Sequence, residues 1–183
     1  MKQVDATRLV IVDESGSNIA LTPLYARAPK GERASGSVPP ESSGKIPRSW
    51  LPCRSTFVGA CMILEGSVNT LAFEAYVEQI LAPSLSPGQI VVLDNLSAHT
   101  GARVRQLIEE RGCELFFLPA YAPDYSPIEE TFSKLNAFLR RVGARTHEAL
   151  QEAIGQALET VTAQDALGWF THCGYRPAQA SDL

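Results

Sequence analysis

Short runs of apolar residues alternate along the chain with longer stretches in which apolar positions recur at helical spacing. The runs at 8–12 and 89–93 are rich in β-branched residues, which is typical of parallel strands buried on both faces. Turn-forming residues bound three further candidate strands, around 19–21, over 55–64 and over 114–118.

Helical periodicity predicts five helices, over 70–81 (stopped by Pro83), 98–111 (closed by Gly112), 127–142, 147–161 and 163–172. Three early strands in a meander, followed by strand–helix–strand–helix, is the element order of a ribonuclease H-like domain. We therefore expect an α/β fold with a mixed sheet of about five strands, the first three antiparallel, flanked by helices.

Length and composition favour one ordinary globular domain covering residues 1–183. The chain is 45% hydrophobic and 20% charged, and no apolar stretch approaches the roughly 20 residues of a membrane span. The N-terminal residues do not form a signal peptide, so we expect a cytoplasmic protein without a membrane partner. Residues 26–49 are rich in Pro, Gly, Ser and Lys, which predicts a mobile loop. The four cysteines are scattered and without zinc spacing, which favours free thiols.

The net charge of −4 argues against a general nucleic-acid binder, but the charge is unevenly distributed. Residues 61–130 contain 3 Lys and Arg against 10 Asp and Glu, whereas residues 1–60 contain 8 against 5. Bound cations would offset part of the acidic middle. Lys30 and Arg33 belong to the predicted loop, where they either contact phosphates or remain solvated.

Three acidic residues stand where local patterns would place them side by side. Asp13 ends the first β-branched run, Asp94 ends the second, and Glu129 lies in the first turn of a predicted helix. Clustered carboxylates repel one another unless a divalent cation holds them. Metal bound by carboxylates at the end of a mixed sheet is suited to phosphodiester chemistry.

Each acid also has a simpler interpretation. Asp13 can be a turn residue that follows a strand, and Asp94 can begin a loop before a helix. Ser126 and Glu129 fit a capping box with Pro127 at the first helical position, which would leave Glu129 bonded to the backbone. Taken singly, none of the three establishes a metal site.

The surrounding strings favour a common function for the three acids. Residues 12–16 (VDESG), 92–99 (VLDNLSAH) and 118–129 (LPAYAPDYSPIE) resemble the three blocks of DDE transposases. The resemblance is to the bacterial insertion-sequence branch of the mariner superfamily. The 34 residues between Asp94 and Glu129 match its typical spacing, and residues 170–175 (FTHCGY) are similar to the tail of these bacterial members.

The resemblance implies a DNA-cutting and DNA-joining enzyme with a ribonuclease H-like fold. Asp13, Asp94 and Glu129 would be the catalytic triad that binds two Mg²⁺ or Mn²⁺ ions. One ion would activate water for cleavage at the element's end, and the other would stabilise the leaving 3′ oxygen before that hydroxyl attacks target DNA. The expected partners are the DNA of the transposon ends, the target DNA and a second copy of the chain in a homodimer. The expected location is the nucleoid.

Five further residues are candidates for contacting DNA or supporting the metal ligands: His99, Asn95, Glu130, Lys30 and Arg33. Against the family pattern, Ser126 replaces the usual Asn, and Thr100 replaces a Lys that commonly follows the Ala-His pair.

Family members also carry an N-terminal helix-turn-helix region, and this chain begins only a few residues before its first strand. We therefore expect a catalytic domain without that region. The remaining alternatives are a stand-alone metal-dependent nuclease and a catalytically silent remnant that serves only as a binding subunit.

Overall fold

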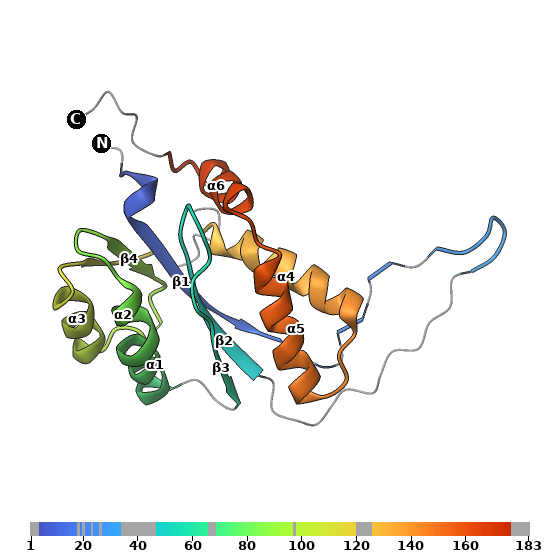
Figure 1. Cartoon of the computed structure of the whole chain (residues 1–183), viewed down its shortest axis with the longest axis horizontal. Helices are drawn as coiled ribbons and strands as arrows, with labels where there is room; N and C mark the ends of the chain where they lie inside the picture. The colour runs from blue at the N-terminus through green and yellow to red at the C-terminus, as the bar shows by residue number, and fades with distance from the viewer. Residues whose placement is uncertain are drawn as a thin grey trace.

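Five strands form one sheet with helices on both faces (Figure 1). A computed structural model describes residues 4–17, 19, 21–22, 24–25, 27–33, 47–65, 69–96, 98–119 and 126–176. In this part of the chain, no helix is both long enough and apolar enough to cross a membrane. The five-stranded sheet with helices on both faces confirms the expected mixed sheet flanked by helices.

The sheet has the strand order β3-β2-β1-β4-β5. Its strands are β1 (Leu9–Gly16), β2 (Pro47–Cys53), β3 (Met62–Glu65), β4 (Ile90–Leu93) and β5 (Glu114–Phe117). The first three strands pair antiparallel, and β4 and β5 then extend the sheet parallel to β1. The central strand β1 therefore has β4 as its parallel neighbour, so both strands end at the same edge of the sheet.

Two groups of helices cover the sheet. One face carries α1 (Thr70–Tyr76), a π-helical turn (Val77–Leu81), α2 (Ala82–Ser84) and α3 (Ala102–Glu109), and the other carries α4 (Ile128–Val142), α5 (His147–Glu159) and α6 (Ala163–His172) (Figure 1). Along β1, Val10 and Val12 pack on the first group, whereas Leu9 and Ile11 pack on the second. This alternation decides which face receives each side chain at the strand's end.

Two strand predictions were wrong. Residues 19, 21 and 22 are irregular, and residue 20 lies outside the described residues. The second strand is instead β2, whose first three residues fall inside the predicted loop; residues 34–46 of that loop lie outside the described part. Of the strand predicted over 55–64, only its end is regular, in β3. Strand β2 contains two prolines, which are unusual in strands, so its sequence does not predict a strand. Pro52 is tolerated because β3 pairs only with residues 47–50.

Two helix predictions also needed correction. The helix from Thr70 does not stop before Pro83 but continues to Ser84 through the π-helical turn, in which the Ala82 N–H bonds to the Val77 carbonyl. The wider turn leaves room for the proline ring, which would clash with the preceding turn of a regular helix. The helix predicted from residue 98 begins only at Ala102.

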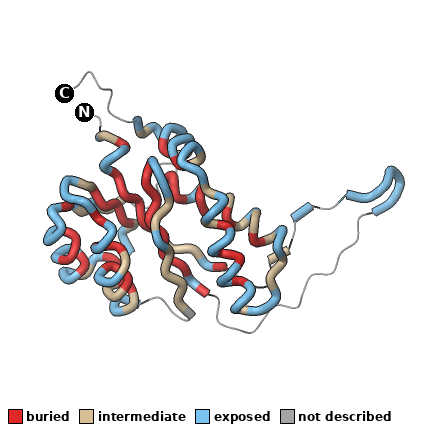
Figure 2. The backbone as a smooth tube through the Cα atoms, in the orientation of Figure 1, coloured by how far each residue is buried: buried red, intermediate tan, exposed pale blue. Residues whose placement is uncertain are grey.

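Large aromatic residues fill the core on both faces of the sheet. Trp50 is fully buried in β2, stacks on Tyr76 at 5.5 Å between ring centroids and meets Phe73 edge-on. Phe170 is fully buried against the opposite face. Figure 2 shows burial concentrated in the strands and on the inner sides of the helices. The four cysteines, all of them within the described residues, form no disulfide.

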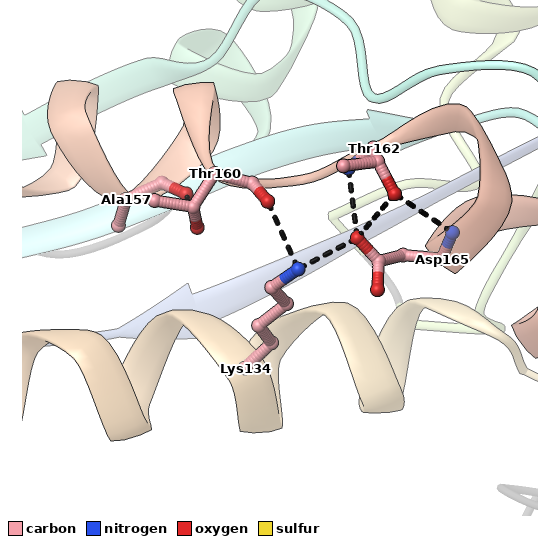
Figure 3. A network of polar contacts seen from close by, with 5 residues as sticks. All are labelled: Lys134, Ala157, Thr160, Thr162 and Asp165. Atoms are coloured by element: carbon pink, nitrogen blue, oxygen red, sulfur yellow. Dashed lines mark hydrogen bonds and ion pairs between the residues drawn. The ribbon is translucent and has the colours of Figure 1, made fainter.

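A polar network joins α4 to the beginning of α6 (Figure 3). The Lys134 ammonium donates to the Asp165 carboxylate at 2.6 Å and to the Thr160 carbonyl at 2.9 Å. Thr162 and Asp165 form a reciprocal capping box at the start of α6. The Lys134 and Thr162 contacts hold the pKa of the Asp165 carboxyl well below its usual range. The network ties the beginning of α6 to α4, the helix that packs on β1 and β2.

Replacing Thr162 by alanine should destabilise the protein by about 1 kcal/mol, because the first turn of α6 loses its side-chain cap. For a chain of this size that is a fall of roughly 2–4 °C in melting temperature. Thr162→Ser keeps the capping oxygen and is the matched control. Equal melting temperatures for the alanine variant and the wild type, measured by circular dichroism, would contradict a stabilising role for this cap.

Candidate active site

Strand register brings Asp13 and Asp94 to neighbouring positions on one face of the sheet. The parallel pairing of β1 and β4 aligns Ile11 with Val92. Continued by two residues, this register places Asp13 opposite Asp94. Both acids share the strand face of Ile11 and Val92, which packs on α4 and α6. The two carboxylates therefore lie beside each other on the α4 side of the sheet.

Glu129 reaches the same region from the N-terminus of α4. The helix begins at Ile128, which is fully buried against the sheet and fixes the first turn next to the strand ends. Glu129 is exposed in that turn. The predicted capping box is wrong, because the N-cap is Pro127, which makes no side-chain cap bond. The Glu129 carboxylate is thus not used as a cap.

The charges of Asp94 and Glu129 both act on Asp13. The pKa of Asp13 is raised from 3.8 to about 6, mainly because burial disfavours the ionised form. A hydrogen bond from the Glu14 N–H opposes this shift. The negative charges of Asp94 and Glu129 add to it, and His99 opposes it. Asp13 therefore lies within the field of both other members of the predicted triad.

Each aspartate has one oxygen held by the protein. The Glu14 N–H donates to Asp13 Oδ1 at 2.7 Å. Asp94 Oδ1 contacts His99 Nδ1 and also accepts a longer bond, 3.4 Å, from the Leu96 N–H. Among the described residues, no hydrogen bond is formed by Oδ2 of either aspartate. Two carboxylate oxygens on the same face are thus left for another ligand.

The carboxylates of Asp13, Asp94 and Glu129 suit a hard divalent cation, but they do not form an assembled binding site as they stand. Carboxylate oxygens are the ligands that Mg²⁺ and Mn²⁺ prefer, and the shared negative field favours a cation. Within the described ranges, however, no three Asp, Glu, His or Cys side chains are gathered tightly enough to hold an ion as they stand. The residues fit the metal in their chemistry, and binding would need the carboxylates to draw together.

The remaining candidates have different surroundings. His99 is buried beside Asp94, whereas Asn95 is exposed in the loop after β4. Glu130 pairs with His172 of α6. Lys30 and Arg33 lie in an exposed segment that stands apart from the sheet, at the far right of Figure 1.

Sequence reasoning missed two supporting features. Glu14 points to the opposite face from Asp13 and pairs with Arg48 of β2, a residue that the sequence places in the flexible loop. Because side chains alternate along a strand, the sequence already indicates that Glu14 faces away from Asp13. The second feature is Phe73, whose ring centroid lies 4.0 Å from that of His99. A contact between residues 26 positions apart leaves no local signal in the chain.

Comparison with known proteins identifies the family and the fold. A family model described as DDE superfamily endonuclease matches residues 8–151. None of the curated proteins compared with the chain matches it. The solved structures it resembles include a Mos1 transposase paired-end complex with the left transposon end, at 17% identity and a TM-score of 0.74. That match covers 92% of this chain and 52% of the other.

Two further structures extend the likeness. The crystal structure of the catalytic domain of Mos1 mariner transposase is 15% identical, with a TM-score of 0.63, over 92% of this chain and 78% of that one. The Mos1 mariner paired end complex with Mn is 18% identical, with a TM-score of 0.69, over 94% and 54%.

These structural similarities establish the fold. The chain spans about half the length of the Mos1 chains in the complexes. The family match covers most of the chain, including Asp13, Asp94 and Glu129. This protein belongs to the DDE superfamily endonuclease family and has the ribonuclease H-like fold of a transposase catalytic domain.

Proposed function

We propose that this domain cleaves DNA at the ends of a mobile element and joins the freed 3′-hydroxyl to target DNA, using two Mg²⁺ or Mn²⁺ ions. The observation that carries the proposal is the convergence of Asp13, Asp94 and Glu129 from β1, β4 and α4. The two aspartates each leave Oδ2 without a hydrogen bond among the described residues, and Asp13 feels the charge of both partners.

Asp13 and Asp94 would hold the metals through those oxygens, with Glu129 completing the set from the helix terminus. When bound, the ions would supply activation of the attacking oxygen and stabilisation of the leaving 3′ oxygen. The protein's part is positioning, because β1 and β4 are hydrogen-bonded neighbours and the residues that precede Asp13 and Asp94 in them are buried. Asp13 Oδ1 is held by backbone and Asp94 Oδ1 by His99 and backbone, which fixes where the free oxygens lie.

DNA is the proposed substrate on both chemical and structural grounds. Cleavage and joining are both in-line displacements at phosphorus, so one set of carboxylates can serve both. The Mos1 structures are complexes with a transposon end and a strand transfer complex. We also propose a homodimer, because two element ends have to be processed together, and a nucleoid-associated location in the cytoplasm.

Thermal melting with and without Mn²⁺ tests the metal site. Mn²⁺ should raise the wild-type midpoint by several degrees, since a ligand that binds only the folded state stabilises it. Glu129→Gln should largely remove that response, because glutamine is a poor metal ligand. The substitution disturbs no cap, since the N-cap of α4 is Pro127.

The matched control is Glu130→Gln, which alters the adjacent acid on the same helix turn. Glu130 pairs with His172 and not with the triad, so this variant should keep the Mn²⁺ response. Equal responses in the Glu129 variant and the wild type would remove Glu129 from the ligand set. No response in any variant, with or without duplex DNA, would refute a metal-dependent enzyme and favour the silent remnant.

Cleavage products separate transposition from simple hydrolysis. Incubation with Mn²⁺, supercoiled plasmid and a labelled oligonucleotide bearing a free 3′-hydroxyl should yield labelled plasmid if the domain joins strands. Nicked but unlabelled plasmid would instead indicate a stand-alone nuclease.

A further inference from the structure

His99 occupies a buried position directly beside one of the three acids. Its side chain is 1% exposed, and the loop after β4 places its Nδ1 against Asp94 Oδ1. The Asp94 side chain is 33% exposed, so the pair has one buried and one partly open member. His99 therefore holds Asp94 from the interior, on the side away from solvent.

The chemistry of the pair assigns the direction of this bond. An ionised carboxylate only accepts hydrogen bonds, so the imidazole donates from Nδ1. The Leu96 N–H also donates to Oδ1. Both contacts therefore act on the same oxygen and fix the rotation of the carboxylate about its Cβ–Cγ bond. Oδ2 forms no hydrogen bond with the described residues, and the Asp94 carboxylate lies close enough to Asp13 for its charge to act on that residue.

The other ring nitrogen of His99 has no comparable role. Nε2 is buried and has no hydrogen-bond partner among the residues that the structure describes. The ring instead packs on Phe73 of α1, with the two ring planes tilted by 38°. The ring is thus held by packing from one helix layer, and the polar contact that its side chain makes with the described residues is to Asp94.

We propose that His99 is a positioning residue that presents Asp94 Oδ2 to the metal site. The inference rests on the proposed function, since it assigns Asp94 as a ligand. A ligating carboxylate that is fixed by a neighbouring donor loses less rotational freedom when the ion binds. Residues that orient metal ligands in this way typically change metal affinity by about 10- to 100-fold when removed.

Two substitutions of His99 separate positioning from packing. The amide nitrogen of His99→Asn lies at the same number of bonds from the backbone as Nδ1, whereas that of His99→Gln lies as far out as Nε2. Both variants lose the ring that packs on Phe73, so their packing costs are similar. We expect Asn to keep Mn²⁺ affinity within about threefold, and Gln and Ala to weaken it by about 10- to 100-fold.

Mn²⁺ binding to the full chain is measured directly, by the paramagnetic resonance signal of the free ion, with circular dichroism as the check of folding. Equal affinities for the Asn and Gln variants would overturn the positioning role, whether both matched the wild type or both were weakened. A wild type that binds no Mn²⁺ would instead overturn the proposed function, and the assignment of His99 with it. If the Ala variant does not fold, the Asn and Gln comparison decides the matter.

Discussion

Asp94→Asn is expected to abolish metal-dependent DNA cleavage, with a loss of about 10³-fold or more, the scale seen when a group that acts in the transition state is removed. Asparagine can still accept the His99 and Leu96 hydrogen bonds through Oδ1. It replaces the free, negatively charged Oδ2 with an amide group. The measurement is single-turnover nicking of supercoiled plasmid in Mn²⁺.

Two results would show that the loss reflects the site and not the fold. The Asp94→Asn variant should melt without metal at or above the wild-type temperature, because one of the mutually repelling charges is gone. Glu130→Gln, assayed in parallel, should cleave at close to the wild-type rate. Cleavage retained by pure Asp94→Asn protein would show that Asp94 is not a catalytic ligand.

Asp13→Asn should stabilise the metal-free protein at neutral pH while removing its response to Mn²⁺. The raised pKa of Asp13, about 6 against 3.8, means that the folded protein holds the proton more tightly than the unfolded chain. For a fully buried group this difference would be worth about 3 kcal/mol. Asp13 is only partly buried, so we expect about 1–2 kcal/mol after screening by solvent.

The effect has a defined pH window. Below about pH 4 the carboxyl is protonated in both the folded and unfolded states, and the wild type has the full benefit of the neutral form. As the pH rises through about 6, ionisation in the folded state removes that benefit, so the wild type loses stability relative to the variant.

Melting temperatures of wild type and Asp13→Asn, measured from pH 4 to pH 8 in chelator, should therefore diverge with rising pH. A constant difference across this range would contradict an ionised, destabilising Asp13. Adding Mn²⁺ at pH 8 should reverse the order, because only the wild type offers a carboxylate there.

The elements that carry the site were largely predictable because their signals are local. The buried runs that end at Asp13 and Asp94 consist of consecutive β-branched residues, and such runs leave few alternatives to a parallel strand. The helix that presents Glu129 was predicted to begin at residue 127, next to its observed start at Ile128. The proximity of the acids then follows from the topology of the sheet.

The rest depended on contacts that no local pattern encodes. Strand β2 contains Pro47 and Pro52, and it is held in the sheet by pairing with β1 along residues 48–53. Ser126 and Glu129 satisfy the sequence rule for a capping box, yet the chain enters α4 one residue later than the rule requires. The contact of His99 with Phe73 exists only after α1 has packed on the sheet.

Side chains alternate between the two faces along β1 and β4, so the effect of a length change in either strand depends on whether the number of residues is odd or even. Asp13 lies two positions after Ile11, and Asp94 lies two positions after Val92. Because side chains alternate along a strand, both acids face α4 as those two residues do. A single-residue insertion or deletion inside either strand would turn its acid toward α1 and α3. Changes of two residues would preserve the side but move the acid along the strand by about 7 Å. Length variation among natural relatives should therefore be confined to the loops, even where the strand sequences themselves diverge freely.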